Sequence, residues 1–485
     1  MSAPAMAVAS EEHAHVASFY HLRDEVQGSA HACRGLACFA ARNDDPTLWQ
    51  AAQREPWLYC LGQCHRAPTS GVVPGPEATV RVQSRAPVLL ERIVAGGATN
   101  LDAYRRLGGG RALEIALALQ PTELVQRIEA SALRGRGGAG FPAGRKWAAV
   151  AQQSAADKVV VANADEGDAG SYSDRVLIEH DPFRLIEGLR IAAHAVGARR
   201  GYVYLRKEYP RAAAVLTAAI DAAHASGWLA GLELTLVIGQ GSYVAGEETA
   251  LLNSIEGRRA QARLQPPRVA EHGLFGAPTL VNNVETLCAV PWIVEHGAAA
   301  YAALGFSRSR GTKLLSLNSL FGRPGVVEVE FGLALRELVE DIGGGLRRGE
   351  LRALMVGGPL AGLLPPSLLD TRLGFEEMAA IGGAVGHGGV IALSDDTTIA
   401  EVAAQIFRFG AYESCARCVP CHRGTPRIAA LFERALRGER GDAQEYRDCI
   451  EALAATSLCG HGRGLAEFAA SLERHFPQEL AACLA

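Results

Sequence analysis

Residues 158–168 read KVVVANADEGD, a valine-rich apolar run that ends in an amide and three carboxylates. Such a run favours a buried strand that ends near Asn163. Outward from it, helical and strand-like patterns alternate, with helical periods at 184–196 and 212–225 and strand-like runs at 201–205 and 232–238. This alternation predicts an α/β domain built on a largely parallel sheet.

The polar residues at the end of this predicted strand are candidates for ligand binding. They are Asn163, Asp165, Glu166 and Asp168. Ligands of open α/β sheets bind beyond the carboxyl ends of the strands. Clustered carboxylates are costly to bury unless a ligand, a cation or water meets them. A solvated acidic turn is the alternative interpretation.

A glycine-rich segment precedes this strand. Residues 134–142 read RGRGGAGFP, and GRKW follows at 144–147. Glycines let backbone N–H groups come close to a phosphate, while arginine and lysine supply counter-charge. The spacing matches neither the P-loop nor a GxGxxG turn directly after a strand. We interpret it as a nucleotide-binding loop, with a flexible surface loop as the alternative.

Two further polar segments lie downstream. Residues 239–251 read GQGSYVAGEETAL and begin where the strand-like run 232–238 ends. Adjacent Glu247 and Glu248 are unlikely both to face an apolar core. The pair Asn282 and Asn283 offers amides for hydrogen bonds to a heteroaromatic or ribityl group. The alternative is an ordinary strand-to-helix turn with a solvated glutamate pair.

The C-terminal part of the chain changes pattern twice. Residues 313–394 predict a small β-rich domain, with strand-like runs at 313–317, 325–329, 351–356 and 389–393 and one helical stretch at 333–342. Residues 397–485 are rich in Ala, Leu, Glu and Arg and contain few helix breakers. This composition predicts a helical bundle.

A CxxCxxC motif lies in that helical region, within ESCARCVPC at 413–421. This spacing is typical of iron–sulfur ligation, whereas a zinc site more often shows two separated CxxC pairs or histidine partners. Cys459 is the favoured fourth ligand because Gly460 beside it allows close approach. Cys449 is its rival but lies in a continuous helical pattern. Zinc and a chance group of buried cysteines are the alternatives.

Four more cysteines lie in a small N-terminal unit, and we interpret residues 69–90 as its tail and a linker. These are Cys33, Cys38, Cys60 and Cys64. The whole chain has 11 cysteines, most of them clustered. In a reducing compartment, clustering favours metal or cluster ligation over disulfides.

Length and charge narrow the function classes. A chain of 485 residues is long enough for two to four domains. The formal net charge of −4 gives no global attraction for nucleic acid. No apolar run reaches the roughly 18–20 residues of a membrane span, and the N-terminus lacks the positive start of a secretory signal. We therefore expect a cytoplasmic protein without membrane insertion.

Together, these motifs resemble the flavin-bearing, NADH-oxidising subunit of respiratory complex I and its relatives in NAD-linked hydrogenases and formate dehydrogenases, over about residues 110–465. The resemblance implies FMN, NAD(H) and a [4Fe–4S] cluster on Cys415, Cys418, Cys421 and Cys459. It implies that Glu247 and Glu248 act at the site of electron transfer. Around the flavin and nucleotide it places Gly135, Arg136, Gly137, Gly138, Gly140, Phe141, Lys146, Asn163, Asp165, Glu166, Asp168, Tyr243, Gly246, Glu247, Glu248, Asn282, Asn283 and Thr286.

The resemblance also implies an architecture. Residues 1–90 resemble a thioredoxin-like two-iron ferredoxin plus linker, although only residues 39–59 separate its cysteine pairs, fewer than is usual in that family. A [2Fe–2S] cluster on Cys33, Cys38, Cys60 and Cys64 is thereby suggested. A Rossmann-like FMN- and NAD-binding domain at 91–310 follows, then a ubiquitin-like β-grasp domain at 311–396 and a helical [4Fe–4S] domain at 397–485.

The segment Gly167-Asp168-Ala169-Gly170 resembles the soluble dehydrogenase and hydrogenase branch rather than complex I. The implied function is the diaphorase subunit of a soluble NAD-dependent formate dehydrogenase, with a large molybdenum subunit and a small ferredoxin-like [2Fe–2S] subunit as partners. The alternatives are the diaphorase subunit of an NAD-reducing hydrogenase, a branch that often lacks the N-terminal cysteine ligands, and a complex I subunit. A cluster-binding electron-wiring protein without nucleotide is the rival from another class.

Overall fold

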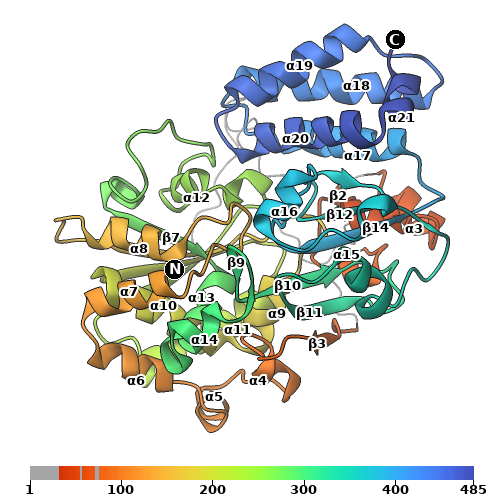
Figure 1. The fold of residues 1–485 in the computed structure, drawn as a ribbon. Coiled ribbons are helices and arrows are strands. Elements are labelled where there is room, and N and C mark those ends of the chain that lie inside the picture. The colour runs from red at the N-terminus through yellow and green to blue at the C-terminus, as the bar shows by residue number, and fades with distance from the viewer. Residues whose placement is uncertain (1–31, 55–56, 71–75) are drawn as a thin grey trace, which may run out of the picture.

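A computed structural model describes residues 32–54, 57–70 and 76–485 (Figure 1). Its first sheet has four parallel strands in the order β6-β5-β4-β7. The valine-rich run forms β4 at the centre of the sheet, paired on both sides and almost entirely buried. The predicted parallel α/β sheet is thus confirmed, with strands β4 (Val159–Ala164), β5 (Arg200–Leu205), β6 (Glu233–Ile238) and β7 (Thr279–Asn283).

Helices cover this sheet, and they begin and end at residue types that favour helix ends. A proline at the first helical position starts both α10 (Pro182–Val196) and α11 (Pro210–Ala225). Gly197, in the left-handed conformation at φ 77°, ends α10. Most of α10 is buried because it packs against α13 (Val284–His296) as well as against the sheet. The other helices near the site are α8 (Ala143–Ala151), α9 (Ser173–His180) and α12 (Glu248–Ile255).

The second sheet has six strands in the order β13-β12-β14-β10-β11-β3. Its two central strands, β10 and β14, are parallel, and an antiparallel strand flanks each of them. This is the β-grasp order that the sequence resemblance implies. The strands are β3 (Val80–Val82), β10 (Thr312–Leu317), β11 (Gly325–Glu330), β12 (Leu351–Val356), β13 (Leu363–Leu364) and β14 (Gly389–Ser394).

Two local details differ from the sequence-based prediction. Residues 80–82 form an edge strand that pairs with β11 in parallel, so the stretch interpreted as tail and linker extends the second sheet. A strand this short shows too little alternation to be recognised. The helix expected at 333–342 begins as α15 (Leu335–Glu337) and continues as the wider turn η4 (Leu338–Ile342).

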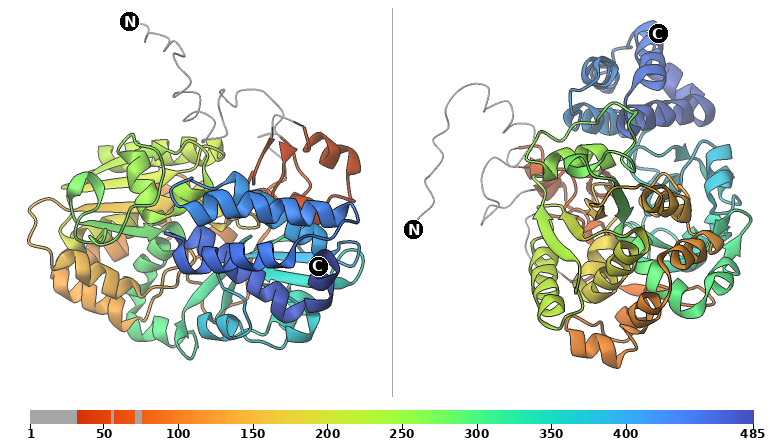
Figure 2. Two further views of the ribbon diagram at one scale, coloured as in Figure 1. Left: turned by 90° about the horizontal axis from the view of Figure 1, so that it is seen from above. Right: turned by 90° about the vertical axis from the view of Figure 1, so that its left-hand side faces the viewer.

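The C-terminal helices stack over one side of the two sheets, as Figures 1 and 2 show. A capping box of Thr398 and Glu401 starts the first of them, and the rings of Phe407, Phe432 and Phe468 pack between them. The predicted helical bundle is confirmed. It comprises α17 (Ile399–Tyr412), the short turn η6 (Pro420–Gly424), α18 (Thr425–Leu436), α19 (Ala443–Thr456), α20 (Gly460–His475) and α21 (Pro477–Cys483).

The described part of the N-terminal unit pairs two short parallel strands, β1 (Ala32–Cys33) and β2 (Trp57–Leu58), beside α2 (Leu36–Ala40) and α3 (Pro46–Ala51). Arg42 joins this unit to the bundle through Thr397 and Glu401. Within residues 32–54, 57–70 and 76–485, no helix combines the length and the apolarity needed to cross a bilayer.

Candidate functional site

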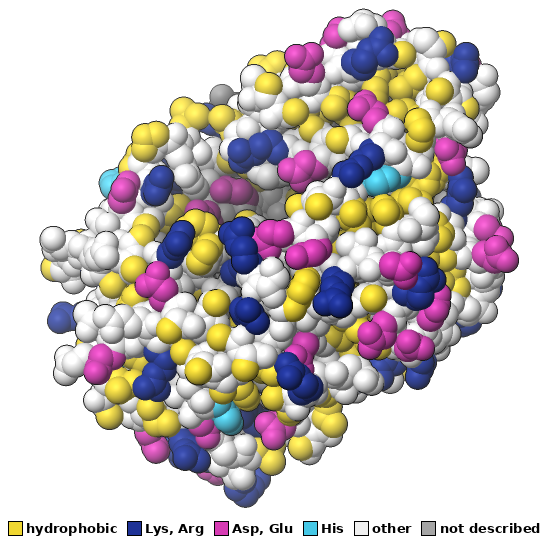
Figure 3. All heavy atoms as spheres, in the orientation of Figure 1, with side chains coloured by type: hydrophobic (Ala, Val, Ile, Leu, Met, Phe, Trp, Pro, Cys, Tyr) yellow, Lys and Arg dark blue, Asp and Glu magenta, His cyan; other side chains and the backbone are white. Residues whose placement is uncertain are grey.

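A cavity of about 750 Å³ opens where the two sheets and the helical bundle meet. Figure 3 shows a hollow below the C-terminal helices, with acidic and basic side chains around it. A cavity of this volume is large enough for a cofactor, since ligand pockets measure about 300–1,000 Å³. All but two of the residues predicted to surround the flavin and the nucleotide line it, namely Gly135, Gly137, Gly138, Gly140, Phe141, Lys146, Asn163, Asp165, Asp168, Tyr243, Gly246, Glu247, Glu248, Asn282, Asn283 and Thr286.

The glycine-rich loop forms one wall. A Cβ on Gly137 would lie 2.8 Å from the Cβ of Asn283, so only glycine lets the loop approach β7 this closely. Gly138 has φ +135°, and no heavy atom lies within 4 Å of the position where its Cβ would be. It forms an isolated antiparallel β-bridge with Gly386 of the second sheet domain. The loop therefore leaves its backbone exposed to the cavity, as an anion-binding loop requires.

Arg136 is one of the two predicted residues that do not line the cavity. Its guanidinium is buried and donates to the Tyr301 hydroxyl at 2.8 Å and the Arg310 carbonyl at 2.7 Å. Its backbone N–H donates to the Thr286 hydroxyl at 2.9 Å. Arg136 therefore fixes the loop from behind rather than facing a ligand.

Glu166 is the second predicted residue outside the cavity wall. Its carboxylate accepts hydrogen bonds from the Ser171 hydroxyl at 2.7 Å and from the backbone N–H groups of Asp174 and Arg175 at 3.0 and 3.1 Å. The two backbone donors belong to the start of α9, where negative charge is stabilised by the helix dipole. The sequence motif could not distinguish this capping carboxylate from a ligand-facing one.

The adjacent glutamates differ in role. Glu247 caps α12, because its carboxylate accepts hydrogen bonds from the backbone N–H groups of Thr249 and Ala250. Glu248 instead forms an ion pair with Lys146, with Nζ and Oε2 2.7 Å apart, and Lys146 also donates to the Val281 carbonyl. Both glutamates line the cavity, but only the Glu248 carboxylate is free of a capping role.

The asparagine pair is also held from behind. The Asn282 side-chain oxygen accepts a hydrogen bond from the Trp147 indole at 2.9 Å. The Asn283 side-chain oxygen caps α13 by accepting from Thr286 N, and its amide nitrogen lies 2.6 Å from Asp174 Oδ2. Since α13 begins at this pair, the amides are fixed at the carboxyl end of β7.

Asp165 has the chemistry of an unoccupied acceptor. Burial raises the pKa of its carboxyl group well above the usual value. Among the described residues, its Oδ2 is buried without a hydrogen-bond partner. A buried acceptor of this kind is costly unless a ligand donates an N–H or O–H to it. The cavity therefore fits a ligand that carries such donors.

The sequence-based prediction missed a wall made by later segments. His387 comes from the turn before β14, and His461 and Arg463 come from the start of α20. The signal was present as two histidines set among glycines, GHGG at 386–389 and GHGRG at 460–464. Because these segments are far from β4 in sequence, only the fold brings them to the same cavity.

The C-terminal cysteines gather at the edge of this cavity. Cys415, Cys421 and Cys459 are buried, and Cys459 lines the cavity. Burial raises the pKa of the Cys421 thiol to about 12, and the neighbouring Cys418, Cys459 and Cys415 also raise it. Metal coordination would reverse this, because it deprotonates thiols. Cys449 lies instead within α19, beside Arg427, Glu445 and Asp448.

The sulfurs of these cysteines are not gathered as closely as a single zinc ion would hold them. Four thiolates around zinc lie about 3.8 Å apart, given Zn–S bonds of about 2.3 Å. Among the described residues, no three cysteine sulfurs lie within 4.8 Å of one another. The same holds for the N-terminal cysteines, which form two pairs: Cys60 and Cys64, with sulfurs 3.6 Å apart, and Cys33 and Cys38, which hydrogen-bond to each other.

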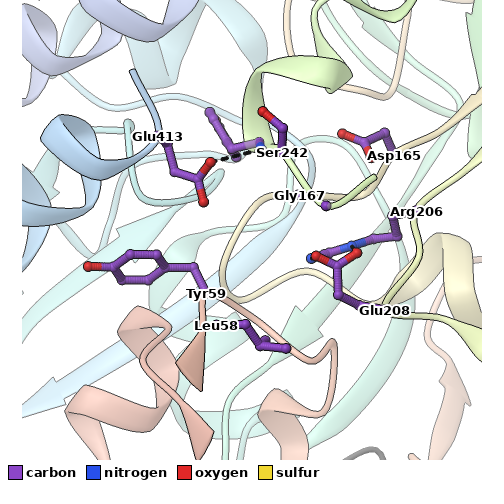
Figure 4. Close-up of a pocket in the computed structure, with 10 residues that line it drawn as sticks. Leu58, Tyr59, Asp165, Gly167, Arg206, Glu208, Ser242 and Glu413 are labelled. Atoms are coloured by element: carbon purple, nitrogen blue, oxygen red, sulfur yellow. Dashed lines mark hydrogen bonds and ion pairs between the residues drawn. The ribbon is translucent and has the colours of Figure 1, made fainter. Parts of the chain in front are cut away.

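A smaller pocket marks where the three units meet beside Asp165 (Figure 4). Leu58 and Tyr59 come from the N-terminal unit and Glu413 from the segment before Cys415. The Glu413 carboxylate accepts a hydrogen bond from the Tyr243 backbone at 3.0 Å, and Arg206 donates to the Cys60 carbonyl at 2.9 Å. Both cysteine sets are thus linked by direct contacts to the strand ends of the first sheet.

Comparison with known proteins identifies the family. Residues 128–292 match the model of the Nuo51 FMN-binding domain, and residues 401–483 match the NADH-ubiquinone oxidoreductase-F iron–sulfur binding region. The chain is 40% identical over 408 residues to the F 2 subunit of NADH-quinone oxidoreductase of Rhizobium meliloti (strain 1021), covering 82% of this chain and 97% of that protein. The chain belongs to the family of NADH-quinone oxidoreductase F subunits.

The relatives also include a hydrogenase component. The chain is 38% identical over 375 residues to NADP-reducing hydrogenase subunit HndC of Solidesulfovibrio fructosivorans, covering 75% of this chain and 76% of that protein. Among solved structures, an NAD+-reducing [NiFe]-hydrogenase in the H2-reduced state matches with a TM-score of 0.82 and 29% identity. That match covers 97% of this chain and 87% of the other.

As a member of this family, the chain has an FMN-binding domain and a [4Fe–4S] region, and NAD(H) is its substrate. The cavity fits this assignment. The backbone of the glycine-rich loop faces it on one wall, and the buried Asp165 Oδ2, which has no hydrogen-bond partner among the described residues, lies on another. The four C-terminal cysteines, three of them buried and Cys418 half-buried, fit a four-iron cluster by residue type and by their place at the cavity edge. The chain is therefore an NAD(H)-dependent flavin and iron–sulfur oxidoreductase.

Proposed function

We propose that this chain is the diaphorase subunit of an NAD-dependent formate dehydrogenase and passes electrons between iron–sulfur clusters and NAD(H) through FMN. The observation that carries this proposal is the complete N-terminal cysteine set, Cys33, Cys38, Cys60 and Cys64, in two buried pairs. The resembling hydrogenase branch often lacks these ligands. The Gly167-Asp168 variant of the acidic turn agrees with the soluble dehydrogenase and hydrogenase branch.

A diaphorase subunit of an NAD(P)-reducing hydrogenase is the second candidate. It is favoured by the likeness of nearly the whole chain to the solved NAD+-reducing hydrogenase and by the identity to HndC. Both candidates share the same chemistry in this subunit and differ only in the partner that supplies electrons.

The residues of the cavity suggest how the reaction is arranged. When bound, FMN exchanges a hydride with NAD(H) and single electrons with iron–sulfur clusters. The glycine loop would present backbone N–H groups to a phosphate, and Asp165 would accept a hydrogen bond from the bound ligand. Lys146 orients Glu248 toward the cavity. Cys415, Cys418, Cys421 and Cys459 would hold the cluster at its edge.

We also propose a [2Fe–2S] cluster on the N-terminal cysteines. Two thiol pairs suit a cluster in which each of two irons takes two cysteines. Backbone N–H groups of Gly35 and Gly62 donate to the sulfurs of Cys33 and Cys60, at 3.4 Å each. Hydrogen bonds to sulfur of this kind tune cluster potentials. The contact of Arg206 with the Cys60 carbonyl would connect this cluster to the flavin site.

The proposal that this chain handles NAD(H) while a partner subunit oxidises formate can be tested with the purified chain. We expect it to oxidise NADH with ferricyanide or a viologen as acceptor, and to show no activity with formate alone. Formate-dependent NAD+ reduction should require a large molybdenum-containing partner. Formate turnover by this chain alone would contradict the proposal, and hydrogen-dependent but formate-insensitive NAD+ reduction by the native complex would establish the hydrogenase candidate instead.

Glu248→Gln is expected to raise the flavin potential and alter NADH oxidation kinetics while leaving FMN stoichiometry near that of the wild type. The substitution removes a negative charge from the cavity and leaves the Lys146 charge uncompensated, and both changes favour a flavin that gains negative charge on reduction. Spectroelectrochemistry and stopped-flow kinetics measure the effect. Glu479→Gln, which breaks a surface pair with Arg352 outside the cavity, is the control. An unchanged potential together with unchanged kinetics would make Glu248 purely structural.

A further inference from the structure

His387 lies in the cavity wall on the turn that precedes β14. It is 4% exposed, so the cavity is its main route to any ligand. The turn is held against the glycine loop, since Gly386 bridges to Gly138. His387 thus belongs to the second sheet domain but faces the site built by the first.

Two carboxylates clamp the imidazole. Its Nε2 lies 2.9 Å from Asp174 Oδ2, and its Nδ1 lies 3.8 Å from Asp168 Oδ2. Asn283 Nδ2 reaches the same oxygen of Asp174 at 2.6 Å. The other oxygen of Asp168 accepts a hydrogen bond from the Tyr243 hydroxyl at 2.7 Å. The ring is therefore fixed between α9 and the acidic turn, next to the asparagine of the cavity wall.

The surrounding charges favour the protonated ring. Burial by itself would lower the pKa of His387, but the carboxylates of Asp174, Glu166 and Asp168 outweigh it and raise the pKa to about 9. Lys313 and Glu285 also pack here and form a buried ion pair with each other, and the Arg206 guanidinium is near enough to act on Asp168. Lys313 also donates to the His387 carbonyl at 3.1 Å. The neighbouring carboxylates therefore favour the imidazolium form at neutral pH.

A bound metal ion does not explain this cluster. The ligating atoms of Glu166, Asp174 and His387 lie within 4.8 Å of one another. However, the carboxylates already accept hydrogen bonds from protein donors, Glu166 from the start of α9 and Asp174 from Asn283 and the Glu285 backbone. A metal ion would have to displace them. The imidazolium itself supplies a positive charge among these carboxylates.

We propose that His387 is a positioned cation of the cofactor cavity, held by Asp168 and Asp174 so that the cavity binds reduced FMN more tightly than oxidised FMN. Oxidation of NADH releases a hydride, which carries two electrons and one proton. When FMN takes up this hydride, the flavin gains one negative charge unless a second proton enters, and the positive charge left on NAD+ departs with that product. A fixed cation in the cavity wall stabilises the negative charge that remains. The inference rests on FMN occupying the cavity and holds whether formate or hydrogen supplies the electrons.

The experiment compares midpoint potentials of the bound flavin, measured by spectroelectrochemistry on the FMN-loaded chain. His387→Gln keeps a side chain that can donate to Asp174 but removes the charge. We expect reduced FMN to bind about tenfold more weakly relative to oxidised FMN, which lowers the potential by about 30 mV for a two-electron couple. His387→Lys keeps a cation and should retain most of the wild-type potential.

The pH dependence separates this role from a structural one. His387 is charged below its pKa, so the potential difference between wild type and His387→Gln should be constant near pH 7 and vanish as the pH rises past about 9. The matched control is His194→Gln, since His194 is a half-buried histidine of α10 whose ring contacts the Leu119 carbonyl outside the cavity. It should behave as wild type.

Two results would overturn the proposal. One is a His387→Gln potential equal to that of the wild type at neutral pH with FMN fully bound. The other is a difference that persists unchanged above pH 9, which would mean a packing effect. If His387→Gln fails to retain FMN, the test uses the wild-type chain alone. A plot of its flavin midpoint potential against pH should change slope near the pKa of His387. A plot without that change would refute the proposed role.

Discussion

Cys459→Ser is expected to remove the C-terminal [4Fe–4S] cluster, with near-complete loss of the EPR signal of the reduced cluster. Cys459 is the N-cap of α20, at the cavity edge, and Cys415, Cys418 and Cys421 lie near it. A serine hydroxyl is a poor substitute for a thiolate ligand. Iron analysis should show the corresponding loss, while FMN content should fall much less because the glycine loop and β4 are unaffected.

The control is Cys449→Ser. Cys449 is also buried, but it lies within α19 and its charged neighbours are Arg427, Glu445 and Asp448. The position where a Cβ of Gly424 would lie is 3.8 Å from the Cys449 Cβ, so the side chain packs against η6. We expect an unchanged EPR signal. If Cys449→Ser removes the signal and Cys459→Ser keeps it, the ligand assignment is wrong.

Gly137→Ala is expected to weaken FMN binding by roughly tenfold to a hundredfold. The new methyl group would lie 2.8 Å from the Cβ of Asn283, so either the loop or the asparagine must move. Overpacking of this kind costs about 1–3 kcal/mol, and each 1.4 kcal/mol is about tenfold in affinity. Displacing Asn283 would also disturb the cap of α13 and the contact with Asp174. Fluorescence titration of the flavin-free chain with FMN measures the loss.

Gly135→Ala provides the matched comparison. It lies in the same loop, but its added methyl group would be 3.6 Å from the nearest heavy atom, the Phe141 carbonyl oxygen, an ordinary contact. We expect its effect on FMN affinity to be clearly smaller than that of Gly137→Ala. Equal losses from both substitutions would mean that the close approach of Gly137 to Asn283 is not what shapes the site.

Much of the fold was predictable because its elements are long and strongly patterned. Local sequence is enough to predict several of these elements. Examples are the valine run of β4, the proline that starts α10 and the alanine-rich helices after residue 397. The edge strand β3 was not predictable. Its three residues form a strand because they pair with the edge of β11, which is far away in the sequence. Pairing between distant segments is a tertiary effect that no local pattern contains.

The site was predictable as a set of motifs but not as a set of roles. Glu166, Arg136 and Glu247 occur inside the right motifs, yet the carboxylates cap helices and the guanidinium supports the loop. Sequence spacing cannot show which side of a turn a carboxylate faces. His387 was missed for a different reason, because its turn belongs to the second sheet domain and reaches the cavity only in the folded chain, where Gly386 contacts Gly138.

The most direct test of the account is an anaerobic titration of the purified chain with NADH, followed by absorbance and EPR on the same samples. We predict that NADH bleaches one noncovalently bound FMN per chain and then produces the EPR signal of a reduced four-iron cluster, without any partner protein. Flavin bands that NADH leaves unchanged, or a flavin that chromatography after acid release identifies as FAD, would contradict the assignment of this cavity to FMN and NAD(H).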